Sequence, residues 1–289
     1  MKTRPIAIIL FICVILASVS LSLTRFGQNN DGENLPPLTC TFLKVGKADA
    51  IILQNQGMTM VIDTGEEDDG QEMVDFLKKN SLPRVDVLII THFDKDHVGG
   101  ADTLVSQVPV DRVLLPDYEG SITDYTDFVL AMNELSIGPE LVNAPLSFPF
   151  GEASVTIHPP RSYEIPEGAA EYDNNFSLVT TITHGANRLL FTGDIQKRRI
   201  REMVADGELR ECKFLKIPHH GVYNTALSEL FETVKPKYSV ICSSDKNPAE
   251  EKTLKLLKKH AIDVLETRHG NITLISDGKN LELRQKVRH

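Results

Sequence analysis

The stretch "THFDKDHVGG", residues 91–100, directly follows the apolar run "VDVLII" and shapes the other expectations for this chain. It holds two histidines and two aspartates within six residues: His92, Asp94, Asp96 and His97. Imidazole and carboxylate ligands together suit Zn, Mn or Fe better than Ca. Successive side chains of an extended loop point to opposite sides, so His92 and Asp94 can bind one ion while Asp96 or His97 turns toward a second. The stretch predicts a metal site at a strand end rather than a polar surface loop.

Further carboxylates and imidazoles end other predicted strands, each beside a glycine. "MVIDTG" places Asp63 at a strand end, "LLFTGDI" places Asp194 just before a helix, and "FLKIPHHG" ends with His219 and His220. Functional sites of α/β proteins collect at such strand ends. A His pair alone is usually polar surface, but the ordered series D…HxDxDH…D…HH indicates one functional site built from distant segments.

The order of predicted elements favours an α/β fold with two sheets. Strands are expected at 38–45, 50–54 and 58–63, followed by an amphipathic helix at 68–80. The second half of the chain repeats these element types. Because strands cluster and helices alternate without a strict βαβ rhythm, two sheets flanked by helices fit best.

The N-terminus has the pattern of an exported protein. Lys2 and Arg4 precede an apolar run of about 18 residues, which predicts a signal peptide or membrane anchor at 1–25. Polar, Pro/Gly-rich residues 26–37 are expected to be a linker, and 38–289 the folded domain. We therefore expect an extracytoplasmic protein, secreted or anchored to the membrane, with a possible membrane tether and no predicted protein partner.

Charge and cysteine content argue against two classes of protein, those that bind through a general basic surface and those built on a disulfide framework. Three of the 31 basic residues and none of the 40 acidic ones lie in residues 1–25, so the remainder is acidic. That balance argues against binding through a general basic surface, although a local basic groove stays open. Cys40, Cys212 and Cys242 each lie in an apolar run without a CxxC pair, which predicts buried structural cysteines rather than a disulfide framework.

The ordered motifs resemble those of the metallo-β-lactamase fold superfamily, and within it the hydrolase domain of the competence protein ComEC and its stand-alone relatives. The resemblance covers residue 38 to the C-terminus and implies a four-layered αββα sandwich. It rests on these stretches: "KVGKAD" (Lys44–Asp49), "HFDKDH" (His92–His97), "DNNFSLV" (Asp173–Val179), "HHGV" (His219–Val222) and "TRHGNITLISDG" (Thr267–Gly278).

The resemblance implies two divalent metal ions, Zn or Mn. One ion would be held by His92 and Asp94. The implied ligands of the second are Asp96, His97 and one of His219 or His220, with Asp194 bridging both ions. Asp49 and Asp63 would orient a ligand histidine and its loop.

The family pattern has a third histidine ligand at the first ion's site, and no histidine of this sequence matches it convincingly. Asn174 or Asn175 lies nearest that position, whereas His158 and His184 are predicted to be surface residues.

The resemblance implies a phosphodiesterase, and within that class a nuclease acting on single-stranded DNA through a metal-activated hydroxide. Asp96, His219 and His220 are the expected catalytic residues. Lys47 and Lys95 either face the anionic phosphoester substrate or are solvated loop lysines. A wall or lipid phosphoester, a carbonyl hydrolase of β-lactamase or lactonase type, and a binding module without turnover are the alternatives.

Overall fold

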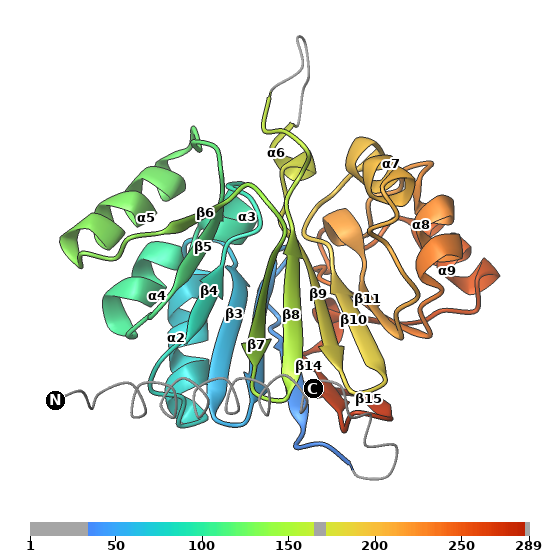
Figure 1. Ribbon diagram of the computed structural model, residues 1–289, viewed down its shortest axis with the longest axis horizontal. Helices are drawn as coiled ribbons and strands as arrows, with labels where there is room; N and C mark the ends of the chain where they lie inside the picture. The colour runs from blue at the N-terminus through green and yellow to red at the C-terminus, as the bar shows by residue number, and fades with distance from the viewer. Residues whose placement is uncertain (1–33, 165–171, 287–289) are drawn as a thin grey trace, which may run out of the picture. The chain divides into compact units, whose positions relative to one another are not determined.

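Two mixed β-sheets lie against each other and carry helices on their outer sides (Figure 1). The computed structural model describes residues 34–164 and 172–286. The predicted signal peptide or anchor and most of the predicted linker lie outside the described residues. All the elements below belong to one unit that starts at Leu35. The predicted sandwich of two sheets flanked by helices is confirmed.

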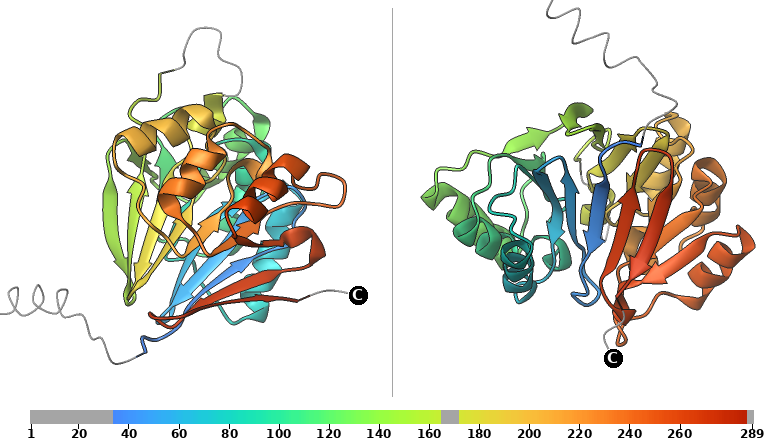
Figure 2. Two further views of the ribbon diagram at one scale, coloured as in Figure 1. Left: turned by 90° about the vertical axis from the view of Figure 1, so that its right-hand side faces the viewer. Right: turned by 90° about the horizontal axis from the view of Figure 1, so that it is seen from below.

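Within the described residues the first sheet has eight strands in the order β15-β14-β1-β2-β3-β4-β5-β6. Strands β3 to β6 are parallel to one another, and the rest pair antiparallel. The first and last strands of the chain thus lie in one half of this sheet, as Figure 2 shows. The strands are β1 (Leu38–Phe42), β2 (Ala50–Asn55), β3 (Met58–Thr64), β4 (Val87–Ile89), β5 (Val113–Pro116), β6 (Glu140–Val142), β14 (Ile272–Ser276) and β15 (Leu281–Gln285).

The second sheet has seven strands among the described residues, in the order β13-β12-β11-β10-β9-β8-β7. Strands β10 to β13 are parallel, and β7 to β10 are antiparallel. The strands are β7 (Leu146–Phe150), β8 (Ala153–His158), β9 (Val179–His184), β10 (Asn187–Phe191), β11 (Phe214–Lys216), β12 (Tyr238–Ile241) and β13 (Asp263–Glu266).

The longer helices cover the outer sides of the sheets, whereas α6 (Tyr172–Asn175) lies beyond the strand ends (Figure 1). The first half contains α2 (Asp69–Lys79), α3 (Lys95–Val98), α4 (Ala101–Gln107) and α5 (Thr123–Glu134). The second half contains α6 (Tyr172–Asn175), α7 (Lys197–Ala205), α8 (Leu227–Val234), α9 (Glu251–Lys259) and the 3-10 turns η1 (Pro218–Gly221) and η2 (Thr267–His269). None of the helices in the described ranges is both long and apolar enough to span a bilayer.

Strand β4 shows why the fold needs layers on both sides of a sheet. Val87 and Ile89 pack into the core between the two sheets, whereas Leu88 packs against the helices α2, α4 and α5. All three side chains are buried. A short, wholly apolar strand is therefore stable only as a central strand with both faces covered. The second sheet has its own outer core with α7, α8 and α9.

The segment after β4 differs from the extended loop expected at 91–97. Asp94 is extended, but Lys95–Val98 form the single helical turn α3. The residues after this turn pack closely against α2, since a Cβ on Gly100 would lie 2.6 Å from the Cα of Gly70. Glycine is required where two helices approach this closely.

Other single-residue expectations have mixed outcomes. Cys40, Cys212 and Cys242 are buried, as predicted, and free. The prediction that His184 is a surface residue is wrong: its side chain is fully buried, and its Nδ1 lies 2.8 Å from Ser276 Oγ. A buried histidine is tolerated here because strand β14 supplies that polar partner.

The end of the predicted linker packs on the domain. The backbone N–H of Leu35 donates to the Asp277 carbonyl at 2.8 Å. Asn55 Nδ2 donates to the carbonyls of Pro36 and Pro37 at 3.2 and 3.1 Å. Residues 35–37 are therefore held by hydrogen bonds to the folded unit.

Candidate metal centre

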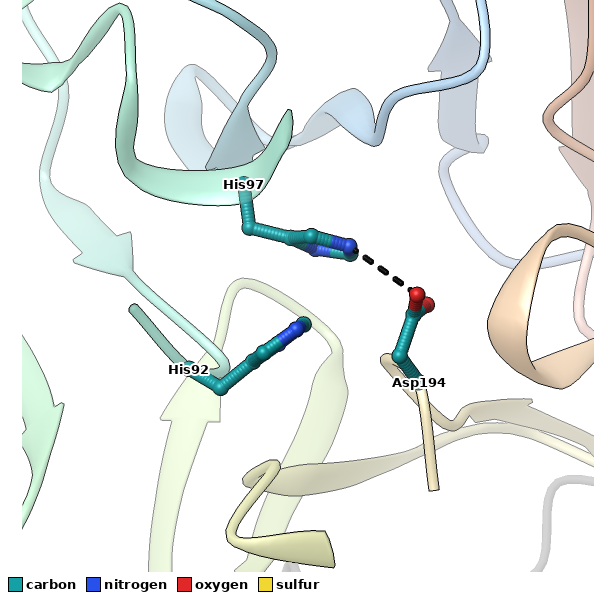
Figure 3. Close-up of side chains that lie close together, drawn as sticks. All are labelled: His92, His97 and Asp194. Atoms are coloured by element: carbon teal, nitrogen blue, oxygen red, sulfur yellow. Dashed lines mark ion pairs between the residues drawn. The ribbon is translucent and has the colours of Figure 1, made fainter. Parts of the chain in front are cut away.

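Four strand ends, those of β3, β4, β10 and β11, bring the predicted ligands to one edge of the sandwich. Asp63 lies in β3, His92 follows β4, Asp194 follows β10 and His220 follows β11. Figure 3 shows His92, His97 and Asp194 turned toward one another. Ligand atoms of these three residues lie within 4.8 Å of each other. Segments about 100 residues apart in the chain thus share one site.

His92 lies at the inner end of the centre with no exposed side-chain surface. Its Nδ1 lies 3.1 Å from Thr91 Oγ1 and 3.4 Å from Ser177 Oγ. Its Nε2 faces Asp94 Oδ2 at 3.5 Å. Because hydroxyls engage Nδ1, Nε2 is the atom left to bind a ligand.

His97 is oriented by the buried carboxylate of Asp63. Its Nδ1 donates to Asp63 Oδ2 at 2.8 Å, while its Nε2 lies 3.3 Å from Asp194 Oδ2. Asp63 also accepts two hydrogen bonds of 2.7 Å from the backbone N–H and the hydroxyl of Thr91. The carboxylate therefore holds both the ring of His97 and the loop that carries His92.

The two adjacent histidines after β11 have different positions. His220 is buried, and its Nδ1 donates to the Cys242 carbonyl at 3.0 Å. Its Nε2 lies 3.3 Å from Asp96 Oδ2 and 3.0 Å from Asp194 Oδ2. His219 is half-buried, and its Nδ1 lies 3.4 Å from Gln196 Nε2. The structure thus places His220 inside the cluster and His219 beside it.

The backbone separates this pair of histidines. His219 and His220 both have left-handed φ angles, 50° and 51°. Such angles are uncommon for residues other than glycine, and His is among the residues enriched there. Two successive left-handed residues reverse the chain tightly after the strand, so the side chains leave in different directions. Ring centroids 6.4 Å apart and a 63° angle between planes record this divergence.

The electrostatics of the centre favour bound cations. Burial opposes the charge on Asp194, but His220, His97 and Lys216 hold its pKa well below the usual range. Burial disfavours the charged form of His220, yet the surrounding carboxylates, chiefly Asp194, raise its pKa to about 9. The carboxylates therefore draw protons onto the imidazoles, which is the charge that a metal ion replaces when it binds.

The residues present fit two divalent ions. Three buried Nε2 atoms, those of His92, His97 and His220, have no hydrogen-bond partner among the described residues. Each faces at least one carboxylate oxygen of the cluster. Nitrogen donors of this kind together with carboxylates are a donor set for Zn, Mn or Fe. Two groups of ligand atoms, His92–His97–Asp194 and Asp96–His97–His220, could each hold an ion.

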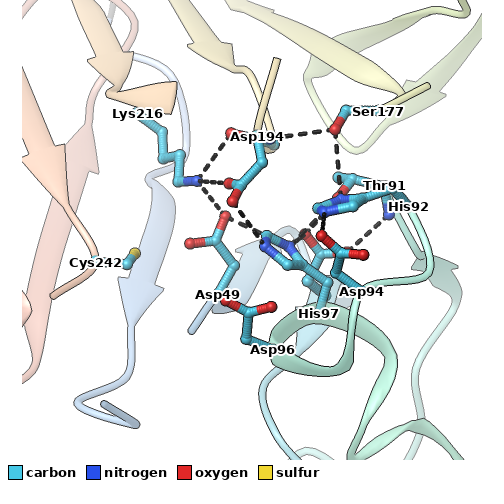
Figure 4. A network of polar contacts seen from close by, with 12 residues as sticks. Asp49, Thr91, His92, Asp94, Asp96, His97, Ser177, Asp194, Lys216 and Cys242 are labelled. Carbon is cyan, nitrogen blue, oxygen red and sulfur yellow. Dashed lines mark hydrogen bonds and ion pairs between the residues drawn. The ribbon is translucent and has the colours of Figure 1, made fainter. Parts of the chain in front are cut away.

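Lys216 and Cys242 belong to the centre but were missed in the sequence (Figure 4). The Lys216 ammonium group is fully buried and pairs with Asp49 Oδ2 and with Asp194 Oδ1, the latter at 3.3 Å. Burial disfavours its charge, but Asp49 and Asp194 raise its pKa above the ordinary lysine range. The sequence did contain a signal for this pairing. Lys216 lies inside the apolar stretch "FLKIP", and a lysine is almost never buried unless it is paired with an opposite charge.

The predicted asparagines at the third-ligand position have separate surroundings. Asn175 Oδ1 accepts the backbone N–H groups of Gln196 and Arg199 at 3.2 and 3.3 Å, so it caps the start of α7. Asn174 is buried, and its Oδ1 lacks a hydrogen-bond partner within the described residues. Asp173 Oδ1 likewise lacks a partner there, and burial first, with the charge of Asp94, raises the pKa of its carboxyl group.

The two predicted substrate lysines are placed differently. Lys95 is exposed on α3, and its Nζ lies 3.4 Å from Glu66 Oε1. Lys47 is half-buried in the loop before Asp49. Burial lowers the pKa of His219, and the positive charge of Lys47 acts in the same direction.

Comparison with known families agrees with this geometry. A family model described as "Metallo-beta-lactamase superfamily" matches residues 43–244. The chain belongs to the metallo-beta-lactamase superfamily. The matched superfamily region contains all the histidines and carboxylates that form the centre.

Two curated proteins resemble this superfamily chain. It is 28% identical over 200 residues to "ComE operon protein 3" of Bacillus subtilis (strain 168), covering 68% of this chain and 25% of that protein. It is 26% identical over 211 residues to "Recombination protein 2" of Haemophilus influenzae (strain ATCC 51907 / DSM 11121 / KW20 / Rd), covering 71% and 24%. The chain thus spans about a quarter of the length of these relatives. The resemblance to ComEC-like proteins is confirmed.

A solved structure shows the same superfamily fold. CmlA, a diiron beta-hydroxylase from Streptomyces venezuelae, matches with a TM-score of 0.53 and 16% identity, covering 87% of this chain and 58% of that one. At this identity the likeness establishes the fold alone.

Proposed function

We propose that this chain is an exported, metal-dependent phosphodiesterase whose substrate is single-stranded DNA. The observation that carries the proposal is the convergence of three buried imidazole Nε2 atoms on the carboxylates of Asp94, Asp96 and Asp194. Such a donor set at the edge of a rigid sheet is suited to hydrolysis rather than to a purely structural site, because the strand ends face solvent-accessible loops.

Two divalent ions, Zn or Mn, would occupy the centre. His92 and Asp94 would hold the first ion, and Asp96, His97 and His220 the second. Asp194 Oδ2 lies 3.0 Å from His220 Nε2 on the second ion's side, and ligand atoms of Asp194 and His92 lie within 4.8 Å of each other, so Asp194 is placed to be shared. When bound, such ions supply Lewis acidity and lower the pKa of a coordinated water.

The protein's own groups orient this centre and its substrate. Asp63 and the Cys242 carbonyl keep the Nδ1 protons of His97 and His220 away from the site, which leaves both Nε2 atoms as donors. His219, beside the centre, would donate a hydrogen bond to a phosphoryl oxygen. Lys47, whose charge acts on His219, would contribute positive charge toward an anionic substrate.

The choice of a phosphoester substrate rests on the donor set and on the relatives. A carboxylate oxygen at position 94 is a harder metal ligand than an imidazole nitrogen would be. Hard oxygen ligands suit the metal ions that enzymes use with phosphate substrates. The similarity to "ComE operon protein 3" and "Recombination protein 2" supports a nucleic-acid substrate. The charged, apolar N-terminal segment supports action outside the cytoplasm, with the chain secreted or tethered to the membrane.

The experiment offers purified full-length protein three substrates: single-stranded DNA, bis-p-nitrophenyl phosphate and the β-lactam nitrocefin. Each is tested with Mn or Zn added and after chelation. Asp96→Ala removes a carboxylate of the centre, whereas Asp127→Ala removes an exposed carboxylate from α5 and is the matched control. We expect metal-dependent cleavage of both phosphodiesters, lowered on the order of 100-fold or more in Asp96→Ala and unchanged in Asp127→Ala.

Two other results would redirect the proposal. Cleavage of the small phosphodiester without cleavage of DNA would keep the chemistry and replace the substrate by another phosphoester. Hydrolysis of nitrocefin, with neither phosphodiester cleaved, would refute the phosphodiesterase.

A further inference from the structure

Lys216 places a full positive charge inside the proposed metal centre. Its side chain is completely buried at the end of β11. Nζ contacts Asp49 Oδ2, the Gly193 carbonyl at 3.0 Å and Asp194 Oδ1 at 3.3 Å. An ammonium group has three hydrogens to donate, and these three acceptors use all of them. Burying a charged lysine is strongly unfavourable unless partners compensate, and these three acceptors supply that compensation.

The contact with Asp194 determines which of its oxygens is available. Oδ1 is taken by Lys216, and the backbone N–H of Asp194 donates to Ser177 Oγ at 3.1 Å. Oδ2 lies 3.3 Å from His97 Nε2 and 3.0 Å from His220 Nε2, and a ligand atom of Asp194 lies within 4.8 Å of one of His92. A carboxylate fixed at one oxygen cannot rotate to offer both oxygens to a single ion.

The contact with Asp49 joins the two halves of the site. The backbone N–H of Asp49 donates to the Asp96 carbonyl at 3.0 Å, and the Asp49 carbonyl accepts from Gly65 at 2.8 Å. Lys216 itself is anchored because its carbonyl accepts from Thr192 Oγ1 at 2.8 Å. One side chain from the second sheet thereby holds loops that carry ligands from the first.

We propose that Lys216 is a positioning residue that makes Asp194 a single-oxygen bridge between the two metal ions. The inference rests on the proposed pair of divalent ions, but it does not depend on the phosphodiester substrate. The alternative is that Lys216 only neutralises Asp49. If Lys216 positions Asp194, its loss changes how two ions share Asp194. If Lys216 only neutralises Asp49, its loss changes only the stability of the fold.

The test uses full-length protein titrated with Mn, with bound metal counted by mass spectrometry and spin coupling read by electron paramagnetic resonance. The variants are Lys216→Met, the double variant Asp49→Asn/Lys216→Met, and Lys213→Met as the control. Lys213 lies just before the same strand and bonds outside the centre, to Asn187 Oδ1 and the Lys279 carbonyl. The double variant removes opposite charges together, so it leaves no unpaired buried charge at position 49.

We expect wild type and Lys213→Met to bind two Mn ions with an exchange-coupled signal. Lys216→Met and the double variant should keep one ion, bind the second roughly 10- to 100-fold more weakly, and lose the coupled signal. Wild-type metal binding and coupling in either variant would overturn the inference. Because the double variant leaves no lone carboxylate at position 49, it decides the question if Lys216→Met fails to fold.

Metal counting separates this inference from the proposed function. Two coupled Mn ions without phosphodiester cleavage would refute the activity and leave the role of Lys216 standing. Fewer than two ions in wild type would refute the bridge itself.

Discussion

Replacing Asp63 by Asn should switch the tautomer of His97 and thereby weaken metal binding. The carboxylate accepts three hydrogen bonds of 2.7, 2.7 and 2.8 Å, two from Thr91 and one from His97 Nδ1. An amide has only one oxygen acceptor, and its NH2 group donates. If the amide oxygen stays on the Thr91 backbone N–H, the NH2 group faces His97 Nδ1. The imidazole proton must then move to Nε2, the atom that faces the centre.

The magnitude follows from the loss of a ligand's orienting partner. Such changes typically cost 10- to 100-fold in metal affinity, about 1.4–2.8 kcal/mol. Backbone strain does not contribute, because Asp63 has a φ of 58° and Asn is among the residues that best tolerate this left-handed conformation. The size of the side chain is also unchanged. The effect of Asp63→Asn is therefore expected on metal affinity rather than on folding.

Isothermal titration of full-length protein with Mn measures this effect directly. Asp86→Asn is the matched control, because Asp86 Oδ2 also accepts a backbone N–H at 2.7 Å but precedes β4, at the strand end opposite the centre. The control should bind Mn as wild type does. An Asp63→Asn affinity within twofold of wild type would show that Asp63 does not set the tautomer of His97.

Three further predictions concern the stability of the fold. Gly100→Ala should lower the free energy of unfolding by about 1–3 kcal/mol, because its Cβ would lie 2.6 Å from the backbone of α2; Gly138→Ala, with open space at that position, is the control, and equal urea midpoints would contradict the prediction. Phe214→Ala should cost about 3–5 kcal/mol in urea unfolding, because its ring packs between two others at 5.6 and 5.7 Å; a loss under about 1 kcal/mol would exclude that packing role. Burial raises the pKa of Asp69 to about 6, above its usual value near 4, so its stabilising effect is present below pH 4 and is lost as pH rises through 6. Asp69→Asn should remove that part of the pH dependence, and an unchanged difference in unfolding free energy between pH 4 and 7 would argue against it.

The local sequence was sufficient to place most of the centre at strand ends. A short strand of apolar residues, such as Val87–Ile89, is stable only in a sheet covered on both faces, and polar ligand types directly after it must lie at the sheet edge. The same reasoning applies to Asp63 and Asp194. Residue type and strand position are local properties, so they can be recognised without knowing what lies opposite.

Local reasoning failed where the outcome depended on a partner distant in sequence. His184 resembles a surface residue until Ser276 is seen beside it, 92 positions away. Burial of Lys216 is not expected from the sequence, because its ammonium group is compensated by Asp49 and Asp194, which only the fold brings to it. Neither contact follows from periodicity or composition, because charge compensation in a buried site depends on which segments meet.

The amino-acid sequence by itself therefore indicated many of the elements, the two-sheet architecture and the types of side chain that could bind metal. Only the tertiary structure decided that His220 rather than His219 enters the cluster, because that choice depends on two successive left-handed residues and on the Cys242 carbonyl. It also decided which atom of each clustered histidine faces the centre. Hydrogen-bond partners from several strand ends orient each imidazole ring, and they become neighbours only after the sheets have packed.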